Sequence, residues 1–81
     1  MNPRAISVKY RSPYTLIINF DNKEVKEFDL TPYLVYSVYE RLKEETYCMK
    51  AHVKKGIVVW DDETDFDPDT LYLESRTLIT A

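Results

Sequence analysis

The segment that most constrains the fold is Tyr14–Phe20, a run of β-branched and aromatic residues after the break at Ser12-Pro13. Its apolar side chains at positions 16, 18 and 20 would share one face, because side chains alternate between the two faces of a strand. The run therefore predicts the most buried strand of the molecule. Turn residues follow at Asp21-Asn22-Lys23, and they predict a hairpin that leads into a third strand within Glu24–Leu30.

The first and third strands have weaker patterns. Apolar and polar residues alternate along Ala5–Arg11, which predicts a half-buried strand whose inward side chains are Ile6, Val8 and Tyr10. Within Glu24–Leu30, an unbroken alternation would place Val25 on the face of the strand opposite to Phe28 and Leu30. We therefore expect a bulge or an early strand end in this segment.

A helical segment is expected after the third strand. Thr31-Pro32 is typical of a helix start, with Thr as the N-cap and Pro at the first helical position. Leu34, Val38 and Leu42 then follow at i, i+4 and i+8, which is the spacing of an amphipathic helix. The pattern predicts one short helix, or two fragments of one, packed across the sheet.

The remaining strands are expected on either side of the only glycine. Tyr47–Val53 alternates like a strand, and Lys55-Gly56 provides a turn. The apolar run Ile57–Trp60 is typical of a central strand paired to the preceding one. The predicted fold is therefore α+β, a small antiparallel sheet of about four to five strands with one short helix across it and a final helical turn.

The chain is expected to form a single domain over residues 1–81, because it has no internal repeat and no linker-like tract. Residues 76–81 are too few to form another element at a chain end, so we expect a frayed tail there. The N-terminus lacks an apolar signal region, and no run reaches the roughly 18 to 20 apolar residues of a membrane span. These features predict a cytoplasmic protein that does not contact a membrane.

The acidic stretch at residues 61–69 has two interpretations. Hard cations such as calcium prefer several carboxylate oxygens, but reading Asp65 as the first position of a calcium loop leaves the pattern incomplete. Thr70 would stand where glycine is needed, and Arg76 where the bidentate Glu belongs. The favoured interpretation is that Asp67 caps the final helical turn.

The residues that could support catalysis are few. The single cysteine, Cys48, lies four residues before the single histidine, His52, and two ligands at this spacing on a strand do not make a zinc site. Nucleophilic catalysis would require a base and a third orienting group, and His52 has no acidic partner in sequence. We therefore predict that the protein is not an enzyme and has no catalytic residue, metal or cofactor.

Charge is unevenly distributed along the chain. Residues 1–60 contain ten Lys and Arg against seven Asp and Glu, whereas residues 61–81 contain one against seven. Such a tail can steer a partner of opposite charge. The chain also has seven tyrosines, which suit contact surfaces because each combines apolar area with a polar tip. The candidate partner surface comprises Tyr33, Tyr36, Asp61, Asp62 and Glu63.

Three groups of residues carry a family resemblance. The C-terminal group consists of Trp60, Asp65, Pro68, Asp69, Leu71 and Tyr72. The others are Phe20-Asp21-Asn22 with Phe28-Asp29-Leu30, and Val38-Tyr39 with Leu42. Together, over about residues 6–73, they resemble a family of small bacterial proteins catalogued as domain of unknown function 2442. The chain departs from that pattern at Asn22 and Glu63, where the family usually has glycine.

The resemblance implies a small α+β fold without an established enzymatic activity. Some relatives are fused to a helix-turn-helix domain, and some resemble antitoxin-like members of two-gene bacterial modules. We expect the C-terminal group to be mainly structural, with Trp60 and Leu71 as core anchors. Asp65 would accept backbone N–H groups in a loop or cap, and Tyr72 would close the last turn over the sheet.

Two functional hypotheses follow. The leading one is a non-enzymatic protein-interaction module, an antitoxin-like partner of a small protein, that uses its acidic tail and exposed aromatic residues against a basic surface. The alternative is a nucleic-acid-associated transcriptional regulator whose basic surface would be Arg4, Lys9, Arg11, Lys50, Lys54 and Lys55. Nucleic acid is the less expected partner, because a dedicated binder has a basic domain with clustered Lys and Arg. The oligomeric state stays open.

Overall fold

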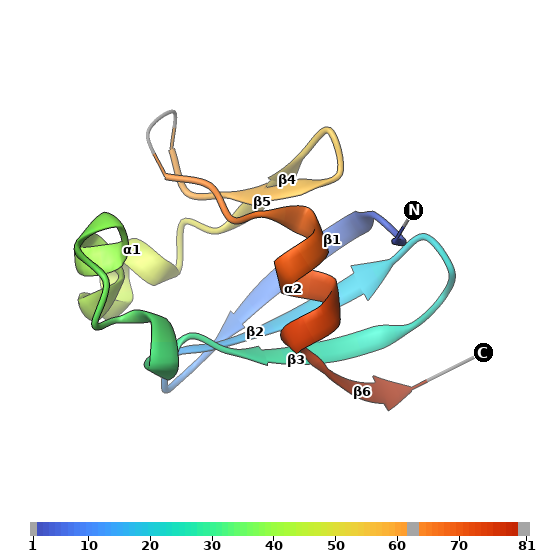
Figure 1. Cartoon of the computed structure of the whole chain (residues 1–81), viewed down its shortest axis with the longest axis horizontal. Helices are drawn as coiled ribbons and strands as arrows, with labels where there is room; N and C mark the ends of the chain where they lie inside the picture. Colours follow the sequence, from blue (N-terminus) through green and yellow to red (C-terminus); the bar gives the residue numbers. More distant parts are fainter. Residues whose placement is uncertain (1, 62–63, 80–81) are drawn as a thin grey trace.

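The computed structural model describes residues 2–61 and 64–79, which form two antiparallel sheets and several short helices (Figure 1). The larger sheet has the strand order β1-β2-β3-β6, with β1 at Ala5–Arg11, β2 at Thr15–Phe20, β3 at Val25–Asp29 and β6 at Arg76–Ile79. The smaller sheet pairs β4, His52–Lys54, with β5, Ile57–Val59. The predicted α+β class is confirmed.

Strand β2 lies between β1 and β3 and is the most buried strand, as predicted. Leu16, Ile18 and Phe20 all point into the core. The turn after β2 differs in detail from the expected one. The positive φ, 72°, is at Lys23 and not at Asn22, because the Asn22 side chain bonds to the backbone two residues further on.

Strand β1 contains a bulge near its start, which changes the side that its first residues face. The pairing with β2 shifts between Ala5 and Ser7, so that Ile6 is the extra residue. Ala5 is consequently buried and Ile6 is 62% exposed. The prediction that Ile6 faces the core is wrong, whereas Val8 and Tyr10 do pack against it.

Strand β3 keeps an unbroken register with β2. The irregularity expected near Val25 is present in the pairing with β6, where the register shifts between Val25 and Lys26. Because the alternation of β3 is preserved, Lys26 points to the same side as Phe28 and is only 7% exposed. A lysine therefore occupies a core-facing position.

The segment after β3 is helical but is not one amphipathic helix. It consists of the 3-10 helices η1, Thr31–Tyr33, and η2, Ser37–Lys43, followed by α1, Glu45–Cys48. An extended residue at Tyr36 separates η1 from η2, and non-helical angles at Tyr39 interrupt η2. The predicted stripe is therefore broken: Leu42 is buried, but Val38 is 70% exposed.

Two of the strand predictions around Gly56 need correction. Tyr47–Val53 was predicted as a strand, but its first part completes α1, since the Cys48 N–H donates to the Glu44 carbonyl at 3.1 Å. Ile57–Trp60 was predicted as a central strand, but β5 pairs with β4 in the separate two-stranded sheet. The Ala5 N–H donates to the Gly56 carbonyl at 3.4 Å and links this hairpin to β1.

Helix α2, Pro68–Glu74, crosses one face of the larger sheet (Figure 1). It begins as predicted, because the Asp67 side chain accepts the Thr70 N–H at 2.8 Å. The chain then pairs β6 with β3, so the prediction of a frayed tail is wrong for residues 76–79. Pairing with β6 satisfies backbone N–H and C=O groups along the edge of β3. The same pairing orders a four-residue segment that would not be stable as an isolated tail. Residues 80–81 lie outside the described part of the chain.

The core lies between α2 and the larger sheet and is closed by the helical segment and the β4–β5 hairpin. Trp60 and Leu71 are both buried in it, as expected for core anchors. The Trp60 indole N–H donates to the Cys48 carbonyl at 3.2 Å, which ties the smaller sheet to α1. None of the described helices is long and apolar enough to cross a membrane.

Candidate protein-interaction surface

The seven tyrosines divide into two groups by what their hydroxyls contact. Four hydroxyls donate within the protein: Tyr10 to Glu45 at 2.6 Å, Tyr14 to the Lys43 carbonyl at 2.5 Å, Tyr47 to Asp61 at 2.7 Å, and Tyr72 to Glu24. The other three, Tyr33, Tyr36 and Tyr39, donate to none of the described residues. All three lie in the segment of η1 and η2, so the tyrosines without an internal acceptor are clustered.

The rings of these three tyrosines extend the aromatic core to the surface. Tyr39 stacks on Phe66 with ring centroids 5.0 Å apart. Tyr33 contacts Phe66 edge-on, with centroids 5.1 Å apart, and stacks on Phe28, with centroids 5.2 Å apart. Tyr36 is the outermost ring, 6.4 Å from Tyr33 and 56% exposed. Because Phe28 and Phe66 are buried, the inner rings are held firmly and Tyr36 is the exposed end of the cluster.

Carboxylates border this aromatic cluster. Burial raises the pKa of Tyr39, and the negative charges of Asp65 and Asp67 raise that pKa further. Burial also raises the pKa of Tyr33, and the negative charge of Glu74, at the end of α2, raises that pKa further. Among the described residues, no Lys or Arg forms an ion pair with Asp65 or Glu74. We call this region the aromatic–acidic surface; it comprises Tyr33, Tyr36, Tyr39, Asp65, Asp67 and Glu74.

The sequence-predicted partner surface is only partly reproduced. Tyr36 is exposed, but Tyr33 is half-buried against the core and presents only part of its ring. Asp61 holds the loop after β5 together, because its Oδ1 accepts the Thr64 N–H at 2.8 Å and its Oδ2 accepts the Tyr47 hydroxyl. Asp62 and Glu63 lie outside the described residues.

Asp65 does not have the role expected from the sequence. Its backbone forms an isolated bridge with Val59. Its side chain is exposed and accepts no N–H group from the described residues. The acceptor roles belong to Asp61 in the loop and to Asp67 at the start of α2. The sequence placed the candidate partner surface at Asp61, Asp62 and Glu63, predicted structural roles for Asp65 and Asp67, and did not single out Glu74. Their signal is the proximity of the tail to the tyrosine segment, which only the fold establishes.

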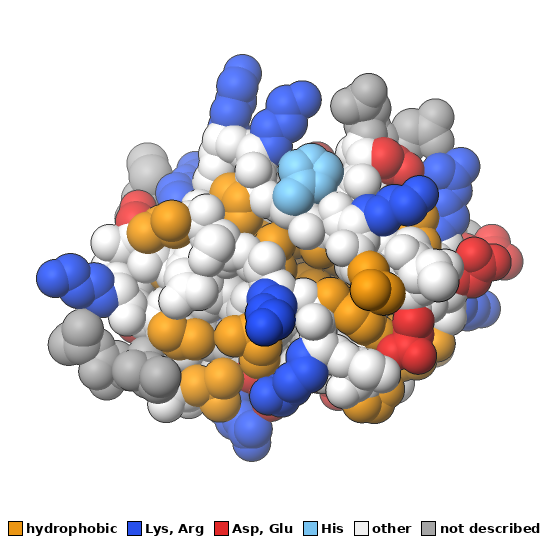
Figure 2. Space-filling view, turned by 180° about the vertical axis from the view of Figure 1, so that it is seen from behind, with side chains coloured by type: hydrophobic (Ala, Val, Ile, Leu, Met, Phe, Trp, Pro, Cys, Tyr) orange, Lys and Arg blue, Asp and Glu red, His pale blue; other side chains and the backbone are white. Residues whose placement is uncertain are grey.

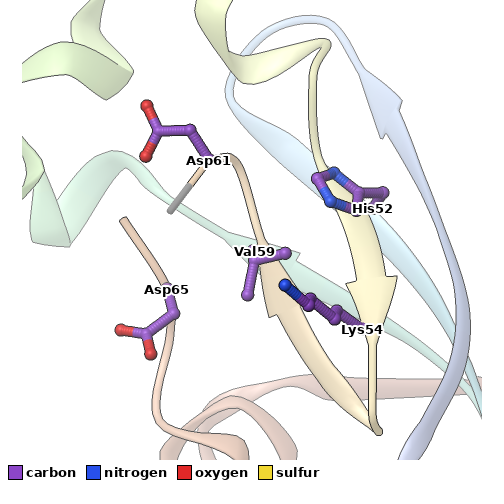
Figure 3. Close-up of a pocket in the computed structure, with 5 residues that line it drawn as sticks. All are labelled: His52, Lys54, Val59, Asp61 and Asp65. Carbon is purple, nitrogen blue, oxygen red and sulfur yellow. The ribbon is translucent and has the colours of Figure 1, made fainter. Parts of the chain in front are cut away.

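A polar hollow of about 210 Å³ lies beside β4 and β5. His52 and Lys54 extend from β4 on one side of Val59, whereas Asp61 and Asp65 lie on the other side with their carboxylates pointing away (Figure 3). The His52 Nδ1 is 2.9 Å from the Lys50 carbonyl. Among the described residues that line this hollow, no carboxylate bonds to the imidazole, so they are not arranged as a catalytic pair.

A second hollow, of about 380 Å³, lies near α1. It is lined by Arg41, Glu44, Tyr47, Lys50 and Asp61. Its two cations, Arg41 and Lys50, are balanced by the two carboxylates, and Arg41 pairs with Asp61. The residues that line this hollow therefore carry no net charge to attract a charged ligand.

The single cysteine is not exposed for chemistry. Cys48 is fully buried, and its Sγ donates to the Leu42 carbonyl at 2.9 Å. Burial raises the pKa of the thiol to about 11, which opposes formation of the nucleophilic thiolate. The described residues contain no group of three or more His, Cys, Asp and Glu side chains that could hold a metal ion.

Basic residues are also prominent on the surface. Figure 2 shows several Lys and Arg side chains on the face seen from behind, together with hydrophobic side chains and fewer acidic ones. Lys54 and Lys55, at the tip of the β4–β5 hairpin, are both exposed. Lys54 lines the same hollow as Asp61 and Asp65, so basic and acidic residues lie close together there.

Searches of curated proteins and of solved structures returned no significant match. One protein-family model does match, and it covers residues 5–77. That range extends from the first residue of β1 into β6 and contains the helical segment, the smaller sheet and α2. The family is described as a protein of unknown function, so the match defines kinship without defining an activity. The chain belongs to this family, domain of unknown function 2442.

Proposed function

We propose that the protein is a non-enzymatic, cytoplasmic protein-interaction module, an antitoxin-like partner of a small bacterial protein, and that it binds a basic surface of that partner. The observation that carries the proposal is the coincidence of unused groups at the aromatic–acidic surface. Three tyrosine hydroxyls there have no acceptor, and two carboxylates have no paired cation, among the described residues.

The chemistry of this surface suits protein binding. Tyrosine rings give a large contact area with little loss of conformational entropy, and their hydroxyls can hydrogen-bond across an interface. Exposed carboxylates favour encounter with a positively charged partner and add specificity more than affinity. The surface also rests on buried rings, so it needs little reorganisation on binding.

The test is affinity co-purification from the native host with the full chain and two pairs of variants. Tyr36→Ser removes the exposed ring, and Met49→Ser is its control, because Met49 is an exposed apolar residue elsewhere. The double variant D65N/E74Q removes two carboxylates from the surface, and D21N/E44Q is its control with the same change in net charge. We expect the surface variants to lose a stoichiometric basic partner that the controls retain. Equal recovery by all four variants would contradict the proposal.

A second candidate is nucleic-acid binding through exposed basic residues. Figure 2 favours it by showing several Lys and Arg side chains on the face seen from behind. Two of the expected residues are already engaged, however, because Arg11 pairs with Glu27 and Lys50 lies over the Tyr47 ring. Binding of duplex DNA that weakens steeply with salt, and that is lost in K54Q/K55Q, would support this candidate. Absence of binding at low salt would exclude it.

A further inference from the structure

The proposed function leaves open which chemical group of the partner is recognised, and the molecule contains an internal guide. In two places a tyrosine ring, a lysine and a carboxylate come together. The Lys26 Nζ lies 3.7 Å from the centre of the Tyr72 ring, while the Tyr72 hydroxyl donates to Glu24. In the other place, the Lys50 Nζ lies 5.7 Å from the centre of the Tyr47 ring, and the Tyr47 hydroxyl donates to Asp61.

The aromatic–acidic surface has two of these three components. Tyrosine rings are present, and Asp65 and Asp67 flank Phe66, the ring that Tyr33 and Tyr39 contact. Among the described residues, no lysine or arginine lies over the ring of Tyr33, Tyr36 or Tyr39. The component that residues 2–61 and 64–79 do not supply is the cation.

Resting on the proposed function, we infer that the partner inserts a Lys or Arg side chain at this surface, with the cation over the Tyr36 ring. Tyr36 is the most exposed ring of the cluster, and its plane is inclined by 46° to that of Tyr33. A cation within about 6 Å of the face of an exposed ring is attracted by the ring quadrupole.

Charge complementarity favours a cationic occupant over an apolar one. The six residues of the surface carry three carboxylates, and residues 61–81 have a large excess of acidic groups. An ammonium and a guanidinium could both occupy the site, but they differ in how they bind. A guanidinium stacks on a ring and bonds two carboxylate oxygens at once, whereas an ammonium acts as a point charge.

The experiment is an NMR titration of the ¹⁵N-labelled full chain with three short capped peptides. The peptides differ only at two central positions, which are Arg, Lys or the neutral isostere citrulline. We expect the Arg or Lys peptide to shift the amide signal of Tyr36, and the citrulline peptide to leave it unchanged. The stronger of the two charged peptides identifies the preferred cation.

Two substitutions of Tyr36 distinguish the effect of the aromatic ring from that of an apolar side chain of similar size. Tyr36→Leu keeps an apolar side chain but removes the ring, and should weaken binding of the charged peptide by about two- to fivefold. Tyr36→Phe keeps the ring and should bind within a factor of about two of the original chain. Equal shifts with the citrulline peptide, or unchanged affinity in Tyr36→Leu, would overturn the inference.

These outcomes are distinguishable from failure of the proposed function. If Tyr36→Ser loses the native partner but the charged peptides bind no better than citrulline, the interaction surface stands and the cation inference is wrong. If Tyr36→Ser and D65N/E74Q both retain the native partner, the proposed surface itself is wrong.

Discussion

At the scale of single residues, Lys26 is the least expected feature of the core. Its stem lies among apolar side chains, and its Nζ donates to the Tyr72 carbonyl at 2.8 Å, near the C-terminal end of α2. A cation at this end of a helix interacts favourably with the helix dipole and satisfies a carbonyl that lacks an intrahelical partner. Lys26 therefore fastens α2 to β3.

Replacing this lysine by methionine tests that role. Lys26→Met keeps a flexible side chain of similar length but removes the charged donor, and should lower the free energy of unfolding by about 1.5 kcal/mol. Urea unfolding followed by Trp60 fluorescence would measure the change. Lys9→Met, at an exposed position of β1, is the control and should alter stability by less than about 0.5 kcal/mol.

The contact between Tyr72 and Glu24 predicts a pH dependence. Hydrogen bonds from the Tyr72 hydroxyl and then from Asn22 hold the pKa of Glu24 below its ordinary value of 4.5. The folded state thus favours the ionised carboxylate, so this contribution to stability is present above pH 4.5 and is lost as the pH falls through the folded pKa. Tyr72→Phe should be less stable than the original chain at neutral pH, and the difference should shrink in acid.

Thermal unfolding of both chains between neutral and acidic pH would measure this difference. A difference in melting temperature that stays constant across the whole pH range would show that the ionisation of Glu24 does not depend on the Tyr72 hydroxyl.

At the scale of elements, the sequence predicted the first three strands well and the helical segment poorly. The hairpin of β2 and β3 has strong alternation and clear turn residues, so local pattern and tertiary packing agree. Between Thr31 and Cys48 they disagree, because side chains spaced for an α-helix lie on 3-10 turns whose repeat is about 3 residues. The tertiary contacts of Tyr33 and Tyr39 with Phe66 outweigh the helical periodicity.

Two residues of the predicted helical stripe distinguish the interrupted 3-10 segment from one continuous amphipathic helix. Leu42 is fully buried, so Leu42→Ala should lower the free energy of unfolding by about 2 to 5 kcal/mol. Val38→Ala removes an exposed side chain and should change that free energy by less than about 0.5 kcal/mol. A continuous amphipathic helix would instead make both substitutions costly, which chemical denaturation would reveal.

The β4–β5 hairpin depends on its two-residue turn. Lys55 and Gly56 have φ of 54° and 79°, as in the turns that favour tight hairpins. A Cβ at Gly56 would also lie 3.0 Å from the Cβ of Arg4. Gly56→Ala should therefore lower the free energy of unfolding by about 1 to 2 kcal/mol. Lys55→Asn in the same turn is the control and should cost nothing, because Asn tolerates positive φ.

At the scale of the whole molecule, charge and aromatic surface are arranged in a way that only the fold reveals. The uneven charge and the tyrosine surplus are visible in the sequence, and they draw attention to Tyr36, which is exposed. The sequence could not place Asp65 and Glu74 near the tyrosines, because roughly thirty residues separate the two segments. It also could not show that Asp61 is occupied within its own loop.

The central claim is that a basic partner binds the aromatic–acidic surface. Its most direct test is the dissociation constant of the co-purified partner, measured at low and moderate salt for the original chain, D65N/E74Q and D21N/E44Q. We predict weaker binding with a smaller salt dependence for D65N/E74Q alone, because only this variant removes carboxylates from the interface. Identical affinity and salt dependence in all three proteins would contradict the claim.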